Sequence, residues 1–444
     1  MSFPRYPAYK DSGVACLGAV PSHWAVKRLR RVVQMNPSKS ETATLSRSSE
    51  VTFLPMEAIG EDGSLVLDRL RPIGELESGY TYFAEGDVAI AKITPCFENG
   101  KGAVMRGLHG GLGFGTTELI VARPLPKHLD SGYLHRIFTS RPFMQQGEAS
   151  MYGAGGQKRV PDDFVRDFAI ALPPVDEQVV INAFLDRETA KIDALVAEQE
   201  QLITRLKEKR HAVISHAVTK GLDPSVPMKD SGVEWLGVVP AHWEVRRVKD
   251  VTRLESGHTP SKTVPEYWID CDIPWVSLND SKYLAANDYI TDTAVQINQL
   301  GIENSSARLL PAGSVVFTRD ATIGLAAITT REMAVSQHLI AWCPTGVMDP
   351  LYLLRAFNAM KDHLDSYTFG ATIKTIGMGD VKSLTTPVPP HEEQLAIAAF
   401  LGKQLQVLDQ LVDEAVLSIE LLRERRSALI SAAVTGQIDV RHLD

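Results

Sequence analysis

KDSGVACLGAVPSHW, at residues 10–24, is the stretch that decides the fold, because it returns as KDSGVEWLGVVPAHW at residues 229–243. The two copies stand 219 positions apart throughout. A second pair of blocks follows in the same order, LPPVDEQ at residues 172–178 and VPPHEEQ at residues 388–394. Self-similarity at a fixed spacing indicates a repeated structural unit. The chain is therefore expected to use one frame twice.

Between the matched blocks the two halves share a rhythm but little identity, over residues 33–160 and 252–375. Short runs of alternating apolar residues, broken by Gly and Pro, predict strands there. Examples are Asp87–Ile93, Thr117–Ala122, Val315–Thr318 and Leu339–Trp342. A helical pattern follows in each half, near Tyr133–Phe143 and Leu351–Leu364. Each half therefore predicts a mixed α/β domain of ordinary size with a surface of its own.

The segments after the two Pro-Pro pairs have a helical pattern. No Pro or Gly occurs from Asp176 to Val218, and the matching segment from Glu392 to Val434 contains only Gly402. Pro before such a segment and Gly after it are the usual punctuation of a helix. Apolar residues follow a heptad seam in both segments. The expected seam residues are Ile192, Leu195, Leu202, Leu206 and Val213, and then Leu408, Leu411, Ala415, Leu422 and Leu429.

A helix of about 40 residues is on the order of 60 Å long and cannot bury an apolar stripe alone. We expect an α/β protein with two mixed domains, separated by two long helices that form an antiparallel coiled coil in a pseudo-twofold duplication. Two amphipathic helices, each packed on its own domain, are the alternative. The expected boundaries are 1–175 for domain 1, 176–221 for helix 1, 222–389 for domain 2 and 390–444 for helix 2.

The composition fits a globular protein. Of its 444 residues, 44% are hydrophobic and 23% are charged, which allows a sizeable core. No apolar run approaches the length of a membrane helix, so a cytoplasmic protein with no membrane partner is expected. The four cysteines lie far apart without a C-x-x-C pair, and we expect reduced, mostly buried thiols.

The sequence offers no motif for catalysis or metal binding. It has no G-x-x-x-x-G-K-[ST] phosphate loop, no H-E-x-x-H zinc motif and no Asn-Pro-Pro-Tyr sequence. Its histidines show no ligand spacing with cysteine or carboxylate, so no metal site is expected. His23 and His242 both stand in Pro-x-His-Trp, where a structural turn over a small apolar cluster explains them and a catalytic role is the alternative. The pattern favours a binding protein.

The matched blocks together resemble the specificity subunit of type I restriction–modification systems. The resemblance rests on Lys10–Trp24 with its copy, on Leu172–Gln178, and on ISHAVTKGLD at Ile214–Asp223. The second half keeps the order, with Val388 in place of the motif's Leu and ISAAVTGQID at Ile430–Asp439. These motifs span the whole chain in the family's order, and they are specific in combination although each is weak alone.

The resemblance implies that each diverged region is a target recognition domain for one half of a split site in double-stranded DNA. It implies that the paired helices set the distance between the half-sites and dock modification (methyltransferase) subunits, of which two are expected. Those subunits bind S-adenosylmethionine, and restriction (motor and nuclease) subunits join the core. The chain itself is expected to bind no cofactor and to catalyse nothing.

Individual DNA-contacting residues follow from chemistry, because base edges and phosphates favour Arg, Lys, Asn and Gln on loops. Gly153–Arg159 is a flexible basic loop with a counterpart at Gly370–Lys374, and a Lys and an Arg follow two equivalent strands. The candidate DNA-binding residues are Lys92, Gln157, Lys158, Arg159, Arg319 and Lys374. For each of them an ordinary solvated surface charge is the alternative.

The net charge of −8 opposes simple duplex binding, since cationic groups on phosphates supply much of that affinity. Local basic groups, or partner subunits that enclose the DNA, would resolve the conflict. Two other functions stay open. A duplicated scaffold that binds no DNA predicts no salt-dependent duplex binding, and a self-contained methyltransferase or nuclease requires reactive motifs.

Overall fold

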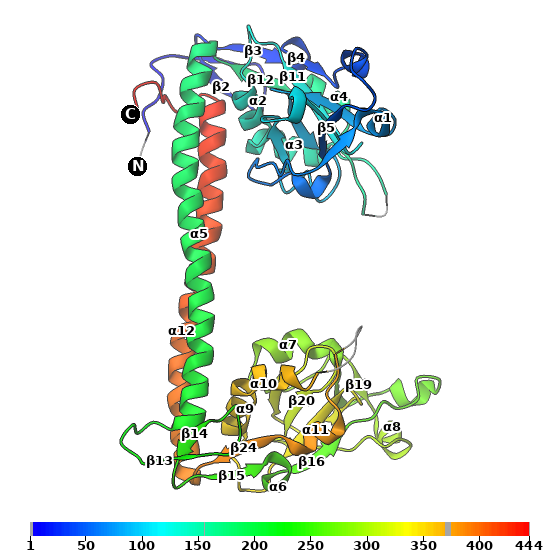
Figure 1. The fold of residues 1–444 in the computed structure, drawn as a ribbon, viewed down its shortest axis with the longest axis vertical. Helices are drawn as coiled ribbons and strands as arrows, with labels where there is room; N and C mark the ends of the chain where they lie inside the picture. The colour runs from blue at the N-terminus through cyan, green and yellow to red at the C-terminus, as the bar shows by residue number, and fades with distance from the viewer. Residues whose placement is uncertain (1–2, 155, 369–373, 444) are drawn as a thin grey trace. The chain divides into compact units, whose positions relative to one another are not determined.

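The computed structural model describes residues 3–154, 156–368 and 374–443. The chain forms two compact units (Figure 1), of which unit 1 contains residues 1–199 and 417–444 and unit 2 contains residues 200–416. Unit 1 therefore combines segments from both ends of the chain, whereas unit 2 is one continuous segment. Each unit contains one of the two diverged regions.

Unit 1 builds its diverged region from two sheets. The first holds, in spatial order, β6 (Leu70–Pro72), β5 (Glu50–Leu54), β10 (Leu112–Gly115) and β7 (Thr81–Ala84). The second holds β4 (Val33–Met35), β11 (Leu119–Pro124), β8 (Val88–Ala91) and β9 (Gly102–Val104). β10 runs parallel to β5, and the other neighbours in these sheets are antiparallel. The strands expected at 87–93 and 117–122 are confirmed as β8 and β11.

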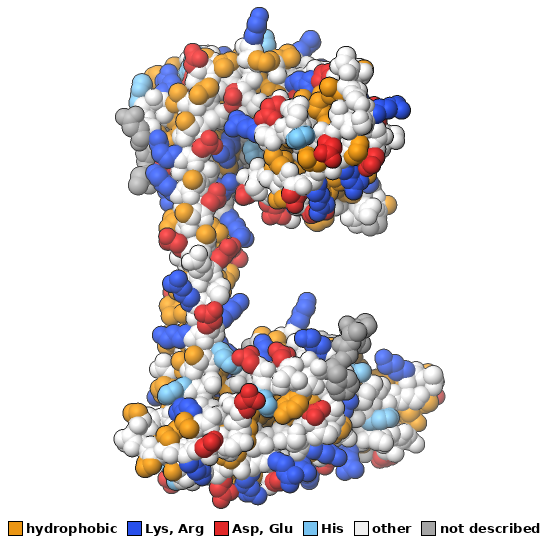
Figure 2. Space-filling view, in the orientation of Figure 1, with side chains coloured by type: hydrophobic (Ala, Val, Ile, Leu, Met, Phe, Trp, Pro, Cys, Tyr) orange, Lys and Arg blue, Asp and Glu red, His pale blue; other side chains and the backbone are white. Residues whose placement is uncertain are grey.

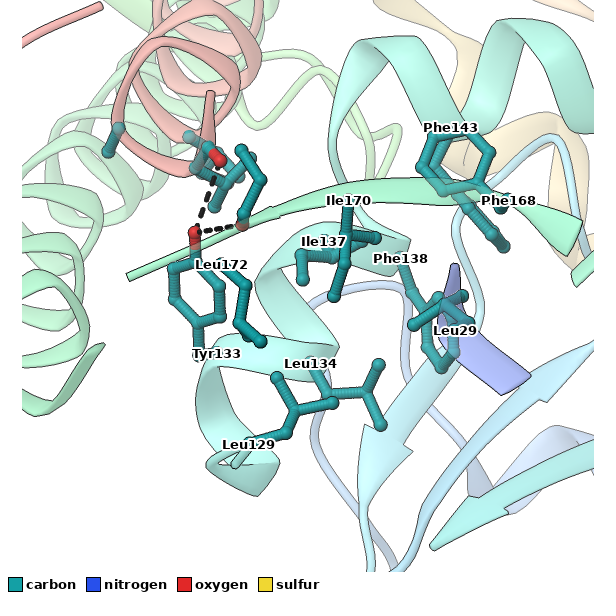
Figure 3. Packing of buried hydrophobic residues seen from close by; sticks show 14 of the residues in the cluster. Leu29, Leu129, Tyr133, Leu134, Ile137, Phe138, Phe143, Phe168, Ile170 and Leu172 are labelled. Carbon is teal, nitrogen blue, oxygen red and sulfur yellow. Dashed lines mark hydrogen bonds between the residues drawn. The ribbon is translucent and has the colours of Figure 1, made fainter. Parts of the chain in front are cut away.

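Helices cover the second sheet and close the core of unit 1 (Figure 3). α2 (Ser131–Phe138) begins where the Asp130 carboxylate accepts the N–H of Tyr133 at 3.0 Å, an N-cap that satisfies one free helix donor. α2 contacts β8, β9 and β11, and α3 (Arg141–Ala149) follows it. The rings of Phe138 and Phe143 lie 4.8 Å apart in this core, and burying each ring stabilises the fold by roughly 1.5–3 kcal/mol.

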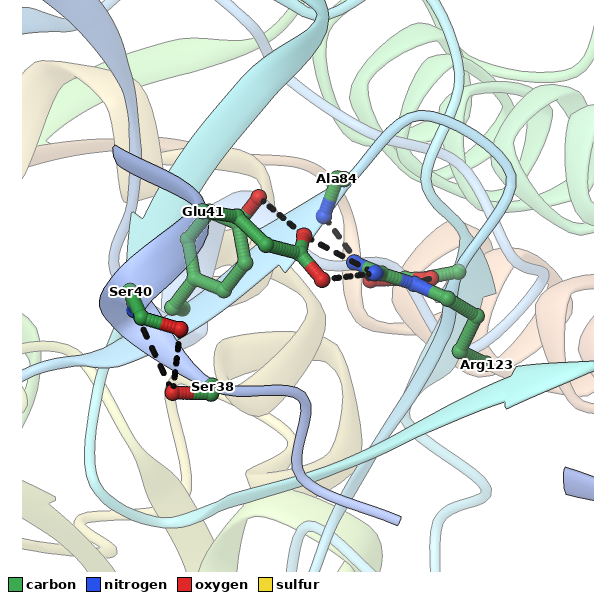
Figure 4. A network of polar contacts seen from close by, with 7 residues as sticks. Ser38, Ser40, Glu41, Ala84 and Arg123 are labelled. Atoms are coloured by element: carbon green, nitrogen blue, oxygen red, sulfur yellow. Dashed lines mark hydrogen bonds and ion pairs between the residues drawn. The ribbon is translucent and has the colours of Figure 1, made fainter. Parts of the chain in front are cut away.

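An ion-pair network joins the two sheets of unit 1 (Figure 4). Arg123 on β11 donates to Asp87 Oδ1 at 2.6 Å and to both carboxylate oxygens of Glu41 at 2.6 and 2.8 Å. Tyr82 on β7 donates to the same Glu41 carboxylate at 2.9 Å. The Asp87 and Glu41 carboxylates raise the pKa of Arg123 above its ordinary value, although partial burial opposes the shift. The network therefore fixes the sheet framework rather than offering a free cation.

Unit 2 repeats the plan with a different second sheet. Its larger sheet holds β16 (Arg253–Ser256), β23 (Leu339–Cys343), β20 (Val315–Thr318), β21 (Ala326–Thr329) and β18 (Tyr289–Ile290). Its smaller sheet holds β19 (Gln296–Ile297), β17 (Ile273–Val276) and β22 (Ala334–Val335). α9 (Pro350–Ala359), capped by Asp349, contacts β20 and β21 as α2 contacts β8 and β9. The strands expected at 315–318 and 339–342 are confirmed as β20 and β23.

The matched sequence blocks form the same strand pairs in both units. In unit 1 these pairs are β1 (Tyr9–Asp11) with β2 (Ala19–Pro21), and β3 (Ala25–Arg28) with β12 (Ala169–Leu172). In unit 2 they are β13 (Met228–Asp230) with β14 (Val238–Pro240), and β15 (Glu244–Arg247) with β24 (Thr385–Val388). The duplication read from the sequence is therefore a duplication of structure.

Two long helices are confirmed, α5 (Val175–Lys220) and α12 (His391–Val434), and they lie side by side in antiparallel orientation (Figure 1). In unit 1, Arg426 Nε donates to Asp193 Oδ1 at 2.9 Å. In unit 2, Arg210 Nε donates to Asp409 Oδ1 at 3.2 Å. The two ion pairs occupy the same positions of the repeat with the helices exchanged. Each unit thus contains part of both helices.

The helix seam differs in phase from the prediction. Ile192, Leu206 and Val213 are buried or half-buried as expected, but Leu195 and Leu202 are 45% and 42% exposed. The inward positions alternate in steps of four and three along both helices. On α5 they are Ile192, Val196, Gln199, Ile203, Leu206, Arg210 and Val213, and on α12 they are Leu401, Leu405, Leu408, Val412, Ala415, Ile419 and Leu422.

The physical reason for the difference is that two neighbouring residues are both apolar at several points along the helix. Hydrophobicity alone then does not decide which of the two faces the other helix. Val196 and Ile203, each one residue beyond the predicted leucine, lie inward instead. The same shift places Val412 inward and leaves Leu411 41% exposed. The predictions for Leu408, Ala415, Leu422 and Leu429 are confirmed.

One described helix, α12, is long and apolar enough to cross a membrane by length and composition. The expectation that no run reaches this length was therefore wrong. The seam described above accounts for only part of this apolarity, because 28% of the most apolar stretch of α12 is buried.

The free cysteines are less buried than expected. Cys343 is buried in β23, an interior strand of the larger sheet, but Cys16, Cys96 and Cys271 are only half-buried. These three lie outside the strands and helices.

A glutamate at the start of each long helix ties the His-Trp turn to it. In unit 1, Glu177 accepts hydrogen bonds from Trp24 Nε1 at 3.0 Å and from the Tyr6 hydroxyl at 2.7 Å, and His23 Nε2 lies 2.8 Å from its second oxygen. In unit 2, Trp243 Nε1 donates to Glu393 at 2.8 Å, and His242 Nε2 lies 2.7 Å from that carboxylate. The structural interpretation of the two histidines is thus supported by their contacts.

The glutamine that follows positions the covering helix. Gln178 Nε2 donates to the carbonyls of Pro173 and His128, both at 2.9 Å, while its oxygen accepts the N–H of Asp130, the N-cap of α2. Gln394 makes the same contacts in unit 2 and accepts the N–H of Asp349, the N-cap of α9, at 2.7 Å. The repeated Glu-Gln pair therefore sets the long helix against the hairpin and against the α/β domain.

Candidate nucleic-acid interface

In unit 1 the candidate residues gather where β8 ends and β11 begins. The N–H of Lys92, just after β8, donates to the carbonyl of Glu118 at 2.8 Å, and the carbonyl of Lys92 accepts the N–H of Val160 at 2.8 Å. The N–H of Thr94 donates to the carbonyl of Lys158 at 3.0 Å. Three segments distant in the sequence thus meet: the end of β8, the start of β11 and the basic loop.

In unit 2 the same backbone frame surrounds Arg319. Its N–H, just after β20, donates to the carbonyl of His338 at 3.0 Å, and its carbonyl accepts the N–H of Ile376 at 2.9 Å. The N–H of Ala321 donates to the carbonyl of Lys374 at 2.9 Å. Position by position, Lys92 corresponds to Arg319, Glu118 to His338, and Lys158 to Lys374. The expectation that Lys92 and Arg319 follow equivalent strands is confirmed.

The side chains on this frame differ between the units. In unit 1, Arg159 donates to both oxygens of Glu118, from Nε at 2.9 Å and from a terminal nitrogen at 2.7 Å. This paired geometry is the strongest that Arg and a carboxylate form, and it lowers the pKa of Glu118 below its ordinary value. Arg159 is therefore held in an ion pair within the domain. Gln157 and Lys158 are exposed and Lys92 is half-buried, while Gly155 lies outside the described residues.

In unit 2, Thr375 occupies the position that Arg159 has in unit 1, and the charged side chains are arranged differently. Arg319 Nε lies 3.7 Å from Asp320 Oδ1, and His338 Nδ1 lies 2.7 Å from Asp320 Oδ2. Lys374 is exposed. Residues 370–373 of the predicted counterpart loop lie outside the described residues.

Sequence reasoning missed three residues of this interface. Glu118, Asp320 and His338 were absent from the candidates, which were chosen for positive charge or amide chemistry. A signal was present, since Glu118 and His338 each stand directly before the run of apolar residues that forms an equivalent strand.

On the face drawn in Figure 2, acidic and basic side chains are interspersed over each unit. Within the described part of the chain, no group of three or more His, Cys, Asp or Glu side chains is arranged to hold a metal ion. The duplicated frame with two different polar surfaces is thus the principal feature that an interface could use.

Comparison with known proteins identifies a family domain in the second half of the chain. Residues 240–413 match the family described as the type I restriction modification DNA specificity domain. The EcoEI specificity subunit of Escherichia coli is 37% identical over 195 residues, which are 44% of this chain and 32% of that subunit. The EcoAI specificity subunit of the same species is 42% identical over 161 residues, 36% of this chain and 27% of that subunit. The matched part of the chain thus spans about a third or less of these relatives.

A solved structure extends the likeness to the whole fold. A chain from a study of complex assembly and conformational transition of the type I R-M system has a TM-score of 0.75 and 17% identity, over 94% of this chain and 98% of that one. The match covers both α/β domains and the long helices, so the two chains share this fold. Residues 240–413 therefore match a specificity domain of type I restriction–modification systems, and the chain resembles the specificity subunits of such systems.

Proposed function

We propose that this chain recognises a split sequence in double-stranded DNA and directs modification and restriction subunits to it, without catalysing a reaction itself. The observation that carries this proposal is the duplicated frame. Equivalent backbone hydrogen bonds hold Lys92, Glu118 and Lys158 in one unit and Arg319, His338 and Lys374 in the other. A single frame with two sets of polar side chains suits two different half-sites, because sequence is read by side chains at base edges.

The exposed apolar residues of the long helices support docking of partner proteins. Leu417 and Leu421 are 55% and 57% exposed in unit 1, and Val407 is 54% exposed in unit 2. Leu417 and Leu421 stand four residues apart on α12 and so share one face of the helix, and neighbouring exposed apolar side chains are typical of surfaces that a partner covers. We assign these surfaces to the modification subunits, two per chain, with S-adenosylmethionine bound by those subunits and the restriction subunits added to that assembly.

The proposal accommodates the net charge of −8. Partner subunits that enclose the duplex supply further cationic groups, so this chain need not neutralise most phosphates itself. The assembly acts on cellular DNA and is therefore assigned to the cytoplasm. The helix pair sets the spacer between the half-sites, and an inserted heptad adds roughly 10 Å, or about three base pairs.

The decisive experiment maps modified bases in DNA exposed to the full chain together with its modification subunit. A split motif that appears only when this chain is present supports the proposal. Calorimetry on the chain alone should detect no S-adenosylmethionine binding, and stoichiometric binding would instead favour a self-contained methyltransferase. An assembled complex that shows no salt-dependent duplex binding would favour the scaffold alternative.

A further inference from the structure

Arg319 and Asp320 form a pair of charged side chains whose hydrogen-bonding capacity is only partly used. Only 23% of the Arg319 side chain and 11% of the Asp320 side chain are exposed. Arg319 Nε and Asp320 Oδ1 are buried and have no hydrogen-bond partner among the described residues. The two atoms lie 3.7 Å from each other, an ion pair that is too long for a hydrogen bond, so Asp320 does not close on the guanidinium and its hydrogen-bonding capacity stays partly unused.

In unit 1, by contrast, an arginine of the same interface is hydrogen-bonded to a carboxylate. Arg159 closes both of its hydrogen bonds on Glu118, as described above. The position of Glu118 is taken in unit 2 by His338, which turns its Nδ1 to Asp320 rather than to an arginine. Among the described residues, the guanidinium of Arg319 therefore makes a long ion pair with Asp320 instead of a paired hydrogen bond, and His338 holds the other oxygen of that carboxylate.

The turn that carries this pair is strained. Ala321 adopts a φ of 64°, in the left-handed region that costs a residue with a side chain about 1 kcal/mol. Thr318 Oγ1 holds the turn by donating to the carbonyl of Thr322 at 2.5 Å, and the N–H of Ala321 donates to Lys374. A strained turn fixed from two sides is typical of a site whose geometry is set for a ligand.

From these observations we infer that Arg319 reads a guanine in one half-site through its paired donors, and that Asp320, held by His338, is the positioning residue that orients it. A guanidinium offers two parallel N–H donors that match the O6 and N7 acceptors of guanine in the major groove. Lys92, at the same position in unit 1, offers a point charge and cannot make that paired contact. The inference rests on the proposed function and gives it a named base reader.

The test compares variants of the full chain, each assembled with its modification subunit, on duplex oligonucleotides that carry the mapped motif or a single substitution in it. Arg319→Ala and Arg319→Lys should both lose about 5- to 150-fold of discrimination at one G·C pair of one half-site. Discrimination at the other positions and in the other half-site should not change. Arg331→Ala, which removes an exposed arginine of the same unit, is the matched control and should leave the motif intact.

The positioning role of Asp320 is tested separately. Asp320→Ala should relax the same G·C position as Arg319→Ala, and the double variant should lose no more than Arg319→Ala alone, because the two residues act as one reader. Independent, additive losses would overturn the positioning role. Thermal unfolding of each variant identifies losses that come from misfolding, and the charge-preserving Arg319→Lys keeps the inference testable if the alanine variant is unstable.

Three results would overturn the assignment of Arg319: an unchanged motif, a uniform loss on all sequences with a shallower salt dependence, or half-sites that contain no G·C pair. The second result identifies a phosphate contact instead. Failure of the unaltered complex to modify or bind any sequence preferentially is a different outcome, since it removes the proposed function itself.

Discussion

Tyr133 donates its hydroxyl hydrogen to the carbonyl oxygen of Val434 at 3.1 Å, although the two residues lie 301 positions apart in the chain (Figure 3). Tyr352 makes the matching contact with Val218 at 3.3 Å in unit 2. Val218 and Val434 occupy the same position of the repeat. The end of α12 therefore takes in unit 1 the place that the end of α5 takes in unit 2.

A circular permutation should preserve function because the two terminal segments already meet. Asp439 N–H donates to the carbonyl of Pro4 at 2.8 Å, and the Tyr9 hydroxyl donates to the carbonyl of Gly436 at 3.0 Å. Joining position 444 to position 1 by a short linker and opening the chain at 223–226 should give a protein that directs methylation to the unchanged motif. Sequencing of modified bases checks this, and an assembled permutant with an altered motif would contradict it.

Removing the glutamate at the start of α5 should cost more than removing its counterpart on α12. The Glu177 side chain is 8% exposed and has three polar partners, whereas Glu393 is 42% exposed and has two. Glu177→Ala strands buried donors of Trp24 and Tyr6 and should lower the free energy of unfolding by about 3 kcal/mol, against about 1 kcal/mol for Glu393→Ala. Denaturant titrations measure both, with the exposed Glu392→Ala as control. Equal losses would show that burial does not set the cost.

Two glycine-to-alanine substitutions should change the stability of the protein in opposite directions. Gly402 lies inside α12 with no atom near its missing side chain, so Gly402→Ala should stabilise the protein by about 1 kcal/mol through helix propensity. Gly436 has a φ of +73°, and a Cβ there would lie 2.3 Å from Pro21 Cδ. Gly436→Ala should therefore lower the melting temperature while Gly402→Ala raises it. A rise in both would exclude the close approach at Pro21.

Acid should destabilise unit 1 through His135. Burial is the main reason that the pKa of His135 falls from 6.5 to about 4, so the folded state favours the neutral ring. This stabilisation is complete above pH 6.5, and it is lost as the pH falls from 6.5 to about 4, by roughly 3 kcal/mol at most. His135→Leu, which installs the residue found at the matching position 354, should flatten the pH dependence of unfolding in that window. An unchanged pH dependence of the free energy of unfolding would mean that groups other than His135 cause it.

Exchange of one diverged region should alter one half of the recognition motif. Replacing residues 33–160 with the equivalent region of a relative leaves Trp24, Glu177 and Gln178 in place, and these residues fix the domain on its helix. Mapping of modified bases should show a new first or second half and an unchanged partner half. A change in both halves would mean that the two domains do not read independently.

The sequence predicted the elements of the fold well because their signals are local. Pro174 and Gly221 bracket α5, and alternating apolar runs mark β8 and β20. The phase of the seam was not predictable, because Leu195 and Val196 are both apolar and only the packing of α12 selects between them. Contacts between distant residues decide such choices.

The candidate site shows the same limit more sharply. Arg159 and Arg319 look alike as basic residues beside strands, yet one is clamped by Glu118, 41 positions away, and the other is free of such a clamp. The partner of each arginine is a tertiary fact that no local pattern records. The sequence showed Glu177 only as a residue that the repeated motif shares. Its hydrogen bonds to Trp24 and Tyr6 explain why the motif has a glutamate at this position.

The division of the chain into one continuous and one discontinuous unit has a consequence for the order of its synthesis. Unit 2 ends at Val416, so all of its core residues exist before the last segment of α12 is made. Unit 1 buries Leu429, Ile430 and Ala433 in the core that also contains Tyr133 and Leu134. The domain that leaves the ribosome first is therefore the last to complete its core, and until then its uncovered apolar surface is the part of the nascent chain most exposed to misassembly.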